Sequence, residues 1–197
     1  MPRLSGPLCA IISAFVLFAA CSAPPQKEID RAQQAIDSAR AAGADQYAPA
    51  AYAAATSALQ QAHEAVAQRD YRLALSHAVD ASDLAQVAAK AAADNKAKAR
   101  SASEAAVSRA NAALRQLEAR VKVAEQARVP PRELSPARTT IKDAEAALQK
   151  ARTLLGAQNY AAATDAVSGL EEQIRSEIRV VDAETTLRTA RRPARKR

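Results

Sequence analysis

The scarcity of helix-breaking residues is the feature that most constrains this chain. Between Pro25 and Pro193 the only glycines and prolines are Gly43, Pro49, Pro130, Pro131, Pro136, Gly156 and Gly169. The segments between them are rich in alanine, glutamine, glutamate, arginine and leucine, which are strong helix formers. The pattern therefore predicts an all-α protein built from long helices.

The breakers divide the chain into five predicted helices. These cover about 27–42, 49–68, 70–129, 135–156 and a last helix that starts at residue 159 and frays into the arginine-rich C-terminus. Gly43 suits the end of a helix and Pro49 suits a first helical turn. We expect Asp70 and Ser135 to cap the helices that follow them.

Each predicted helix carries apolar residues at alternating intervals of three and four, as in coiled coils. The long third helix has one such seam in its first part and another in its last part: Tyr71, Ala74, Ala78, Ala81, Ala85 and Ala88, then Val107, Ala110, Leu114, Leu117, Val121 and Ala124. Because many seam residues are alanine, we expect helix axes near the low end of the usual 8–10 Å spacing. The stretch 94–104 is mostly polar and interrupts the seam, which predicts a neck.

An internal repeat explains this layout. A shift of 89 residues places Ala58-Leu59-Gln60 on Ala147-Leu148-Gln149 and Tyr71 on Tyr160. We therefore predict an elongated, alanine-rich pair of antiparallel three-helix bundles that share the long helix, with coiled-coil-like packing. The first unit would cover 27–95, the polar neck 96–103 and the second unit 104–187, followed by a basic disordered tail over 188–197.

The N-terminal segment predicts export. Arg3 precedes an apolar run over 8–20, which at thirteen residues is shorter than the roughly 20 that a bilayer-spanning helix needs. Leu17-Phe18-Ala19-Ala20-Cys21 resembles the lipobox of bacterial lipoproteins, whose cysteine becomes acylated after the signal is removed. We predict a signal peptide over 1–20, a lipidated linker over 21–26 and lipidation, including palmitate, at Cys21. Cys9 would leave with the signal, and Ser22 in place of aspartate favours the inner leaflet of the outer membrane, facing the periplasm.

The first predicted unit resembles a known family. Three motifs carry the resemblance: Pro24-Pro25, Ala42-Gly43-Ala44-Asp45-Gln46-Tyr47-Ala48-Pro49 and Arg69-Asp70-Tyr71-Arg72-Leu73-Ala74. They are similar to the alanine-rich bacterial envelope lipoproteins that contain domain of unknown function 4398, over about residues 24–93. The resemblance implies helical hairpins and an envelope location. It implies no catalytic residue, because the family has no assigned activity.

Two pairs of residues admit a functional interpretation. His63 and His77 lie symmetrically about the predicted turn at Arg69-Asp70, with Glu64 and Asp80 nearby, and so form a weak candidate zinc site. Zinc usually takes three or four placed ligands, so we favour an interpretation in which the histidines only pack or hydrogen-bond, and we expect no metal or other cofactor. Tyr71 and Tyr160 would either stack on a ligand or plug the open ends of the bundles. The repeat favours the second interpretation.

The excess positive charge lies at the C-terminus. Between Cys21 and Leu187 there are 21 basic and 21 acidic residues, and the excess beyond them is carried by Arg188, Arg191, Arg192, Arg195, Lys196 and Arg197. This tail is either simply solvated or contacts an anionic envelope surface such as peptidoglycan or lipid head groups. Export argues against a nucleic-acid partner.

The sequence predicts a non-catalytic protein. It has no glycine-rich phosphate loop, no cysteine cluster and no G-x-S-x-G turn. We expect a lipid-anchored helical scaffold or binding module in the periplasm, attached to the membrane through Cys21 and contacting peptidoglycan or an envelope protein. The alternatives are an accessory subunit of an envelope transport or assembly complex that docks through coiled-coil seams, and a regulator of an envelope enzyme. Exposed leucine or valine on the last two helices would favour docking.

Overall fold

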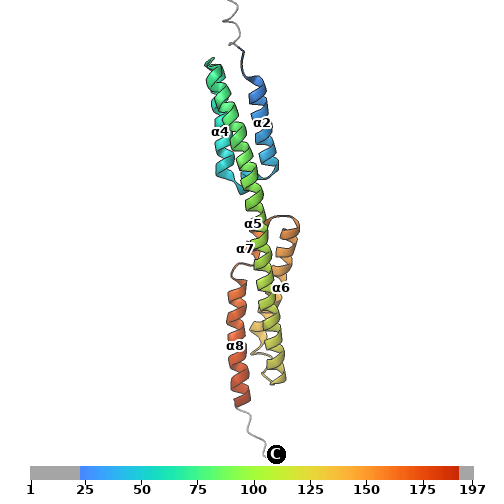
Figure 1. The fold of residues 1–197 in the computed structure, drawn as a ribbon. Coiled ribbons are helices and arrows are strands. Elements are labelled where there is room, and N and C mark those ends of the chain that lie inside the picture. The colour runs from blue at the N-terminus through green and yellow to red at the C-terminus, as the bar shows by residue number, and fades with distance from the viewer. Residues whose placement is uncertain (1–22, 191–197) are drawn as a thin grey trace, which may run out of the picture. The chain divides into compact units, whose positions relative to one another are not determined.

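The computed structural model describes residues 23–190, and within this range all regular secondary structure is helical. The prediction of an all-α fold is confirmed. Figure 1 shows the helices α2 (Gln26–Ala41), α3 (Ala44–Tyr47), α4 (Pro49–Ala67), α5 (Tyr71–Gln126), α6 (Ser135–Gly156), α7 (Tyr160–Ala166) and α8 (Leu170–Ala190). The chain divides into two compact units between Lys96 and Ala97. The predicted signal peptide, Cys21 and the residues after Ala190 lie outside the described residues.

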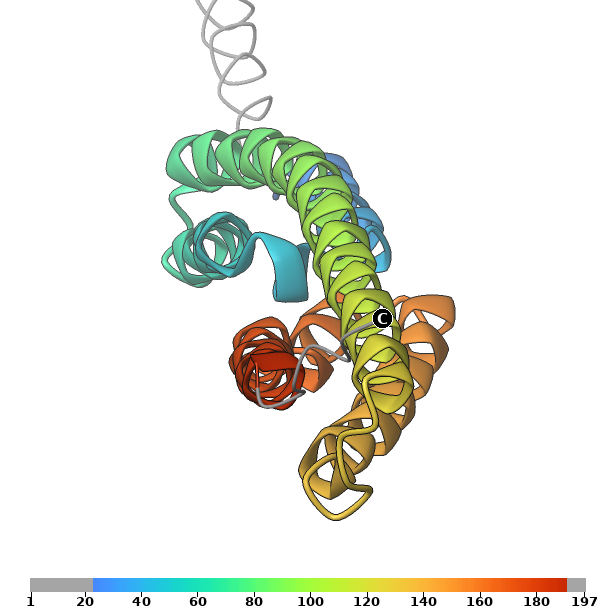
Figure 2. The same ribbon diagram turned by 90° about the horizontal axis from the view of Figure 1, so that it is seen from below.

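The first unit packs α2, α3, α4 and the first part of α5 around a core that is mostly alanine. Figures 1 and 2 place α2 and α4 alongside this part of α5. Ile29, Ile36 and Leu59 are the larger members of the core, and the predicted seam of α5 is buried from Ala74 to Ala88. The burial follows from the predicted three-and-four spacing, which places these alanines on one face of the helix.

Turns in the first unit are set by local backbone chemistry. Gly43 adopts a φ of 85° after α2, a conformation that favours glycine, and the short helix α3 follows it. The amide of Asn95 donates to the carbonyl of Tyr47 at 2.8 Å and so ties α5 to the end of α3. Asp70 accepts a hydrogen bond from the backbone N–H of Leu73 at 3.0 Å, which confirms its predicted capping role.

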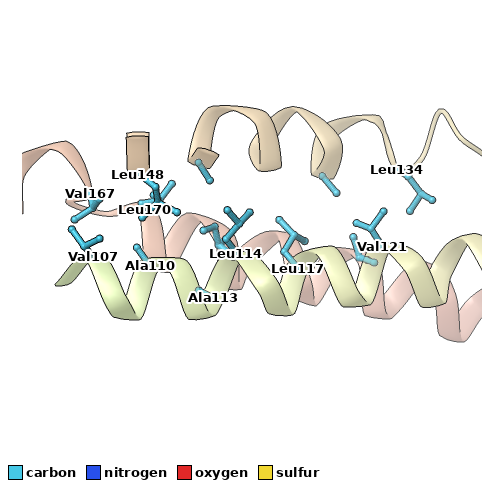
Figure 3. Close-up of a cluster of buried hydrophobic side chains, with 14 of the residues drawn as sticks. Val107, Ala110, Ala113, Leu114, Leu117, Val121, Leu134, Leu148, Val167 and Leu170 are labelled. Carbon is cyan, nitrogen blue, oxygen red and sulfur yellow. The ribbon is translucent and has the colours of Figure 1, made fainter. Parts of the chain in front are cut away.

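The second unit packs the last part of α5 against α6 and α8, with α7 joining α6 to α8. Its core contains larger side chains than that of the first unit, and Figure 3 shows them converging from these helices. Every residue of the predicted seam from Val107 to Ala124 is buried. Figure 2 shows α6 and α8 on different sides of α5, and the ion pairs Arg138–Glu125 (2.7 Å) and Arg120–Asp182 (3.6 Å) link each of them to it.

The repeat of 89 residues is visible in the turns before α5 and α7. The preceding helices end at Ala67 and Gly156, and the caps are Asp70 and Asn159. Arg69 and Gln158 occupy the matching position in each turn and have φ values of 61° and 58°. The two turns therefore share one backbone conformation, as the 89-residue repeat predicts.

Two sequence expectations about helix ends are wrong. Ser135 does not cap α6, because it is the first residue of that helix and no side chain caps its N-terminus. The buried side chain of Leu134 precedes it instead and holds the entry to the helix in the core. The predicted last helix is interrupted between α7 and α8 at Gly169, whose φ is 72°. Val167 and Leu170 are buried on either side of the break, so the apolar seam continues although the helix is interrupted.

The predicted polar neck contains one fully buried residue, Ser103. Its hydroxyl oxygen has no hydrogen-bond partner within the described part of the chain. Ser103 precedes Val107 by four residues and therefore occupies a seam position, with the half-buried Ala99 four residues before it. Although 94–104 is mostly polar, the buried face of α5 continues through it at Ser103.

Replacing Ser103 by alanine should raise the free energy of unfolding by about 1 kcal/mol, because an unpaired buried hydroxyl opposes folding. Urea unfolding followed by circular dichroism measures the change. Ser101→Ala on the exposed side of the same helix is the matched control, since it changes only helix propensity, by roughly 0.5 kcal/mol or less. A loss of stability in Ser103→Ala would show that the hydroxyl has a partner.

Candidate functional site

The alanine-rich packing of the first unit leaves two large grooves, one on each side of α4, and a smaller hollow of about 100 Å³ between α2 and α5. Small seam residues bring helices close together, but they do not fill the space between the outward flanks of neighbouring helices. Each groove is therefore lined both by core residues and by residues that lie next to the seam positions. The two grooves differ in the chemistry of the residues that line them.

The first groove lies between α2 and α4 and has a volume of about 540 Å³. We call it the α2–α4 groove. It is lined by Gln33, Ile36, Asp37, Arg40, Tyr52, Thr56, Leu59, Gln60, His63, Glu64 and Ala67. Both of its carboxylates are engaged within their own helix: Gln33 donates to Asp37 at 3.0 Å and Gln60 to Glu64 at 2.9 Å. The groove combines an apolar floor with charges of both signs.

The second groove lies between α4 and α5 and has a volume of about 640 Å³. We call it the α4–α5 groove. It is lined by Ala54, Ser57, Ala58, Gln61, His77, Asp80, Asp83, Leu84 and Val87. Its floor is small and aliphatic, its charged groups are carboxylates, and no lysine or arginine is among the described residues that line it. This groove is therefore apolar with an acidic rim.

The structure places the two candidate metal-binding histidines in different grooves. His63 lines the α2–α4 groove together with Glu64, whereas His77 lines the α4–α5 groove together with Asp80. Symmetry about the turn at Arg69-Asp70 aligns residues along a hairpin, but rotation about the helix axis decides which flank each side chain occupies. In residues 23–190 no group of three or more histidine, cysteine, aspartate or glutamate side chains is arranged to hold a metal ion.

The two tyrosines at the matched helix starts are not equally accessible. Tyr160 is buried in the second unit, and Tyr71 is half-buried in the first. A stacking platform needs an exposed ring face, which Tyr160 lacks. The packing interpretation therefore holds for Tyr160, which is buried at the start of α7.

The first residue of the predicted basic tail is helical. Arg188 is exposed in the last turn of α8, so the expectation of disorder from residue 188 onward is wrong for 188–190. A cation in this turn also interacts favourably with the helix dipole. The remaining tail residues, Arg191, Arg192, Arg195, Lys196 and Arg197, lie outside the described residues.

The sequence patterns missed the surface residues next to the seams. Leu73, Leu75, Val79 and Val87 on α5 and Val180 and Leu187 on α8 are large apolar residues that stay exposed. Each falls outside the three-and-four spacing of its seam, and that displacement is the signal by which they are recognisable.

Cross-helix ion pairs such as Arg109–Glu171 (3.6 Å) were also missed, because they depend on how the helices pair. The pKa of Arg100 is raised by its hydrogen bond to Glu104, and the exposed guanidinium stays charged.

A comparison with protein families matches residues 27–108 to Domain of unknown function (DUF4398). The resemblance to this family is confirmed. The DUF4398 match contains every residue that lines the two grooves. It begins after the Pro24-Pro25 motif, contains the other two motifs, continues past residue 93 and ends within α5. No curated protein and no solved structure matches the chain.

Proposed function

We propose that this chain is a lipid-anchored lipoprotein of the bacterial cell envelope that acts as a non-catalytic helical scaffold or binding module in the periplasm. The observation that carries the scaffold function is the internal use of the seams: the alanine and leucine positions predicted for coiled-coil packing are buried within each unit. The binding function is supported by the two open grooves of the first unit.

The membrane attachment in this proposal rests on the sequence around Cys21, and Ser22 favours the outer membrane. Across residues 23–190, no helix combines the length and the apolar character that crossing a bilayer requires. A single acyl chain gives only reversible attachment at about 0.8 kcal/mol per buried CH₂, so stable anchoring takes more than one chain. A multiply acylated Cys21 would meet that requirement.

Changing Cys21 to serine should abolish lipid labelling. Cells grown with labelled palmitate should label the wild-type chain strongly and Cys21→Ser not at all, because the thiol is the acceptor. Cys9→Ser is the matched control and should be labelled like the wild type, since Cys9 lies within the predicted signal peptide. Equal labelling of the wild type and Cys21→Ser would exclude the anchor.

The basic tail is a second element of the proposal, as a weak electrostatic tether to an anionic surface. Deleting residues 191–197 should leave helical content and melting temperature unchanged. The deletion should reduce co-sedimentation with peptidoglycan or anionic lipid, and only at low salt, because exposed charges are screened beyond about 8 Å at physiological ionic strength. Replacing the tail's basic residues with glutamine keeps the length of the tail and removes its charge, so this length-matched variant should lose co-sedimentation as the deletion does. Unfolding on deletion would instead assign the tail a structural role.

A second candidate function is an accessory subunit of an envelope transport or assembly complex. It is favoured by Val180 and Leu187, which α8 leaves about half exposed (49% and 51%). Exposed aliphatic residues on this helix are what docking to another coiled coil requires. Crosslinking from Leu187 in cells tests it, and capture of a different envelope protein would support this function over the scaffold.

A further inference from the structure

The exposed aliphatic residues of the first unit gather at one end of it. Within the part of the chain that the structure describes, the large aliphatic residues that stay exposed in this unit are Leu73, Leu75, Val79 and Val87. All but Val87 lie in the first nine residues of α5, and Leu73 and Leu75 are 43% and 41% exposed. Because the Cα–Cβ bonds of a helix tilt toward its N-terminus, these side chains lean toward the turn between α4 and α5.

The turn at this end is basic and carries a tyrosine. Segment 67–75, which we call the α4–α5 tip, contains Arg69, Arg72 and a single carboxylate, Asp70, which is already hydrogen-bonded as the cap of α5. Both arginines are exposed, and Tyr71 is half-buried. Arginine and tyrosine join an apolar stem or ring to a polar end, which suits a boundary between hydrocarbon and water. The tip thus combines the aliphatic, amphipathic and basic side chains that bind at a phospholipid surface.

The α4–α5 tip lies at the end of the unit where the predicted lipid anchor joins the chain. Figure 1 shows the start of α2 and the turn between α4 and α5 at this same end. Glu28 and Arg31 line the smaller hollow together with side chains from 78–83, so α2 begins about level with residue 77 of α5. The start of α5 therefore extends past the start of α2 by roughly 9 Å at 1.5 Å per residue. Cys21 lies five residues before α2, and a chain of that length spans up to about 17 Å, so the tip can reach the bilayer that holds the lipid.

We propose that the α4–α5 tip contacts the phospholipid bilayer that carries the lipid on Cys21, and so holds the first unit end-on to the membrane. Its leucines enter the head-group boundary, and its arginines contact lipid phosphates. Residues 26–31 at the start of α2 add two basic and two acidic residues, and therefore no net charge that would oppose the contact. This inference rests on the lipid anchor of the proposed function and adds how the first unit meets the membrane.

Quenching by brominated lipid tests the contact. The chain without its predicted signal peptide retains every described residue and has Cys21 as its only cysteine, so a maleimide lipid couples it to vesicles through that thiol. The vesicles contain phosphatidylethanolamine, phosphatidylglycerol and phospholipid brominated in its acyl chains. A fluorescent amino acid at the exposed Gln68 of the tip should lose about half of its emission or more, since side chains at the interface are buried about 5–10 Å. The same probe at the exposed Gln86 is the matched control and should lose none, because it lies about 23 Å along α5 from the first residue of that helix.

Equal quenching at Gln68 and Gln86, or no quenching at either, would overturn the proposal. Because the coupling is chemical, the result does not depend on whether cells acylate Cys21. Acylation is decided separately, by the palmitate labelling of Cys21→Ser. The membrane contact and the lipid anchor can therefore each fail without the other.

A pair of variants tests the aliphatic part of the tip. Leu73→Ser with Leu75→Ser should lower the equilibrium constant for the contact about tenfold, measured as the ratio of quenched to unquenched emission at Gln68, because two leucines no longer transfer their exposed surface out of water. Val87→Ser removes an exposed aliphatic side chain farther along the same helix and should leave the ratio unchanged. Circular dichroism confirms that each variant remains helical. Undiminished quenching in the leucine variant would exclude the aliphatic tip as the contact.

Discussion

Replacing Leu117 with alanine should lower the free energy of unfolding of the second unit by about 2–5 kcal/mol. Leu117 is completely buried in α5, where it packs in the cluster that α5, α6 and α8 share. Figure 3 shows its side chain directed into that cluster beside Leu114 and Val121. Truncation removes apolar contacts and leaves a cavity that the surrounding helices cannot close fully, and both effects destabilise the fold. Urea unfolding followed by circular dichroism measures the loss.

The matched control for this substitution is Val123→Ala, which lies less than two turns away on the same helix. Val123 is an exposed valine, so its truncation should change the free energy of unfolding by less than about 0.5 kcal/mol. Hydrogen exchange at α6 and α8 would locate the effect of Leu117→Ala in the second unit. Similar losses in both variants would mean that stability depends on the helicity of α5 and not on the packing of its seam.

Most of the secondary structure could be predicted because it depends on local sequence. The cap Asp70 and the turn glycine Gly43 act within a few residues of themselves, and both lie where the sequence indicates; the cap Asn159 lies at the predicted start of its helix. The seams could also be predicted, because three-and-four spacing places apolar residues on one face whatever the helix packs against. Burial of the long alanine run in α5 follows directly from this spacing.

The expectations that failed depend on the rotation and pairing of helices. The symmetry of His63 and His77 about their turn is a property of the sequence, but the flank that each side chain occupies is set by how α4 is rotated between α2 and α5. The start of α6 is determined by burial of Leu134 in the core, and not by the serine after it. The grooves have the same origin, because they depend on what the packed seams leave unfilled.

The two units differ in how they are packed, and they should therefore respond differently to mutation. The core of the second unit contains leucine, isoleucine and valine from three helices. The core of the first unit is mostly alanine and has few larger residues. Removing atoms is the more damaging change in a core of large side chains, whereas adding atoms is the more damaging change where alanines hold helices close together.

Replacing Ala85 with leucine should therefore lower the free energy of unfolding of the first unit by about 1–3 kcal/mol. Ala85 is completely buried on the seam of α5, where the added isobutyl group must push a neighbouring helix away or leave its preferred rotamer. Thermal unfolding together with hydrogen exchange at α2 and α4 measures the effect. Helix propensity does not explain a loss of this size, because leucine is nearly as good a helix former as alanine.

Ala93→Leu is the control, since Ala93 lies on the same helix with its side chain exposed. It should leave the stability of the first unit unchanged within about 0.5 kcal/mol. If Ala85→Leu is equally neutral, the helices of the first unit can separate without cost, and close packing of alanines does not hold them. If Ala85→Leu destabilises as expected, alanine is required at the seam to keep α5 against α2 and α4, and the open grooves on either side of α4 are the structural consequence of that close approach.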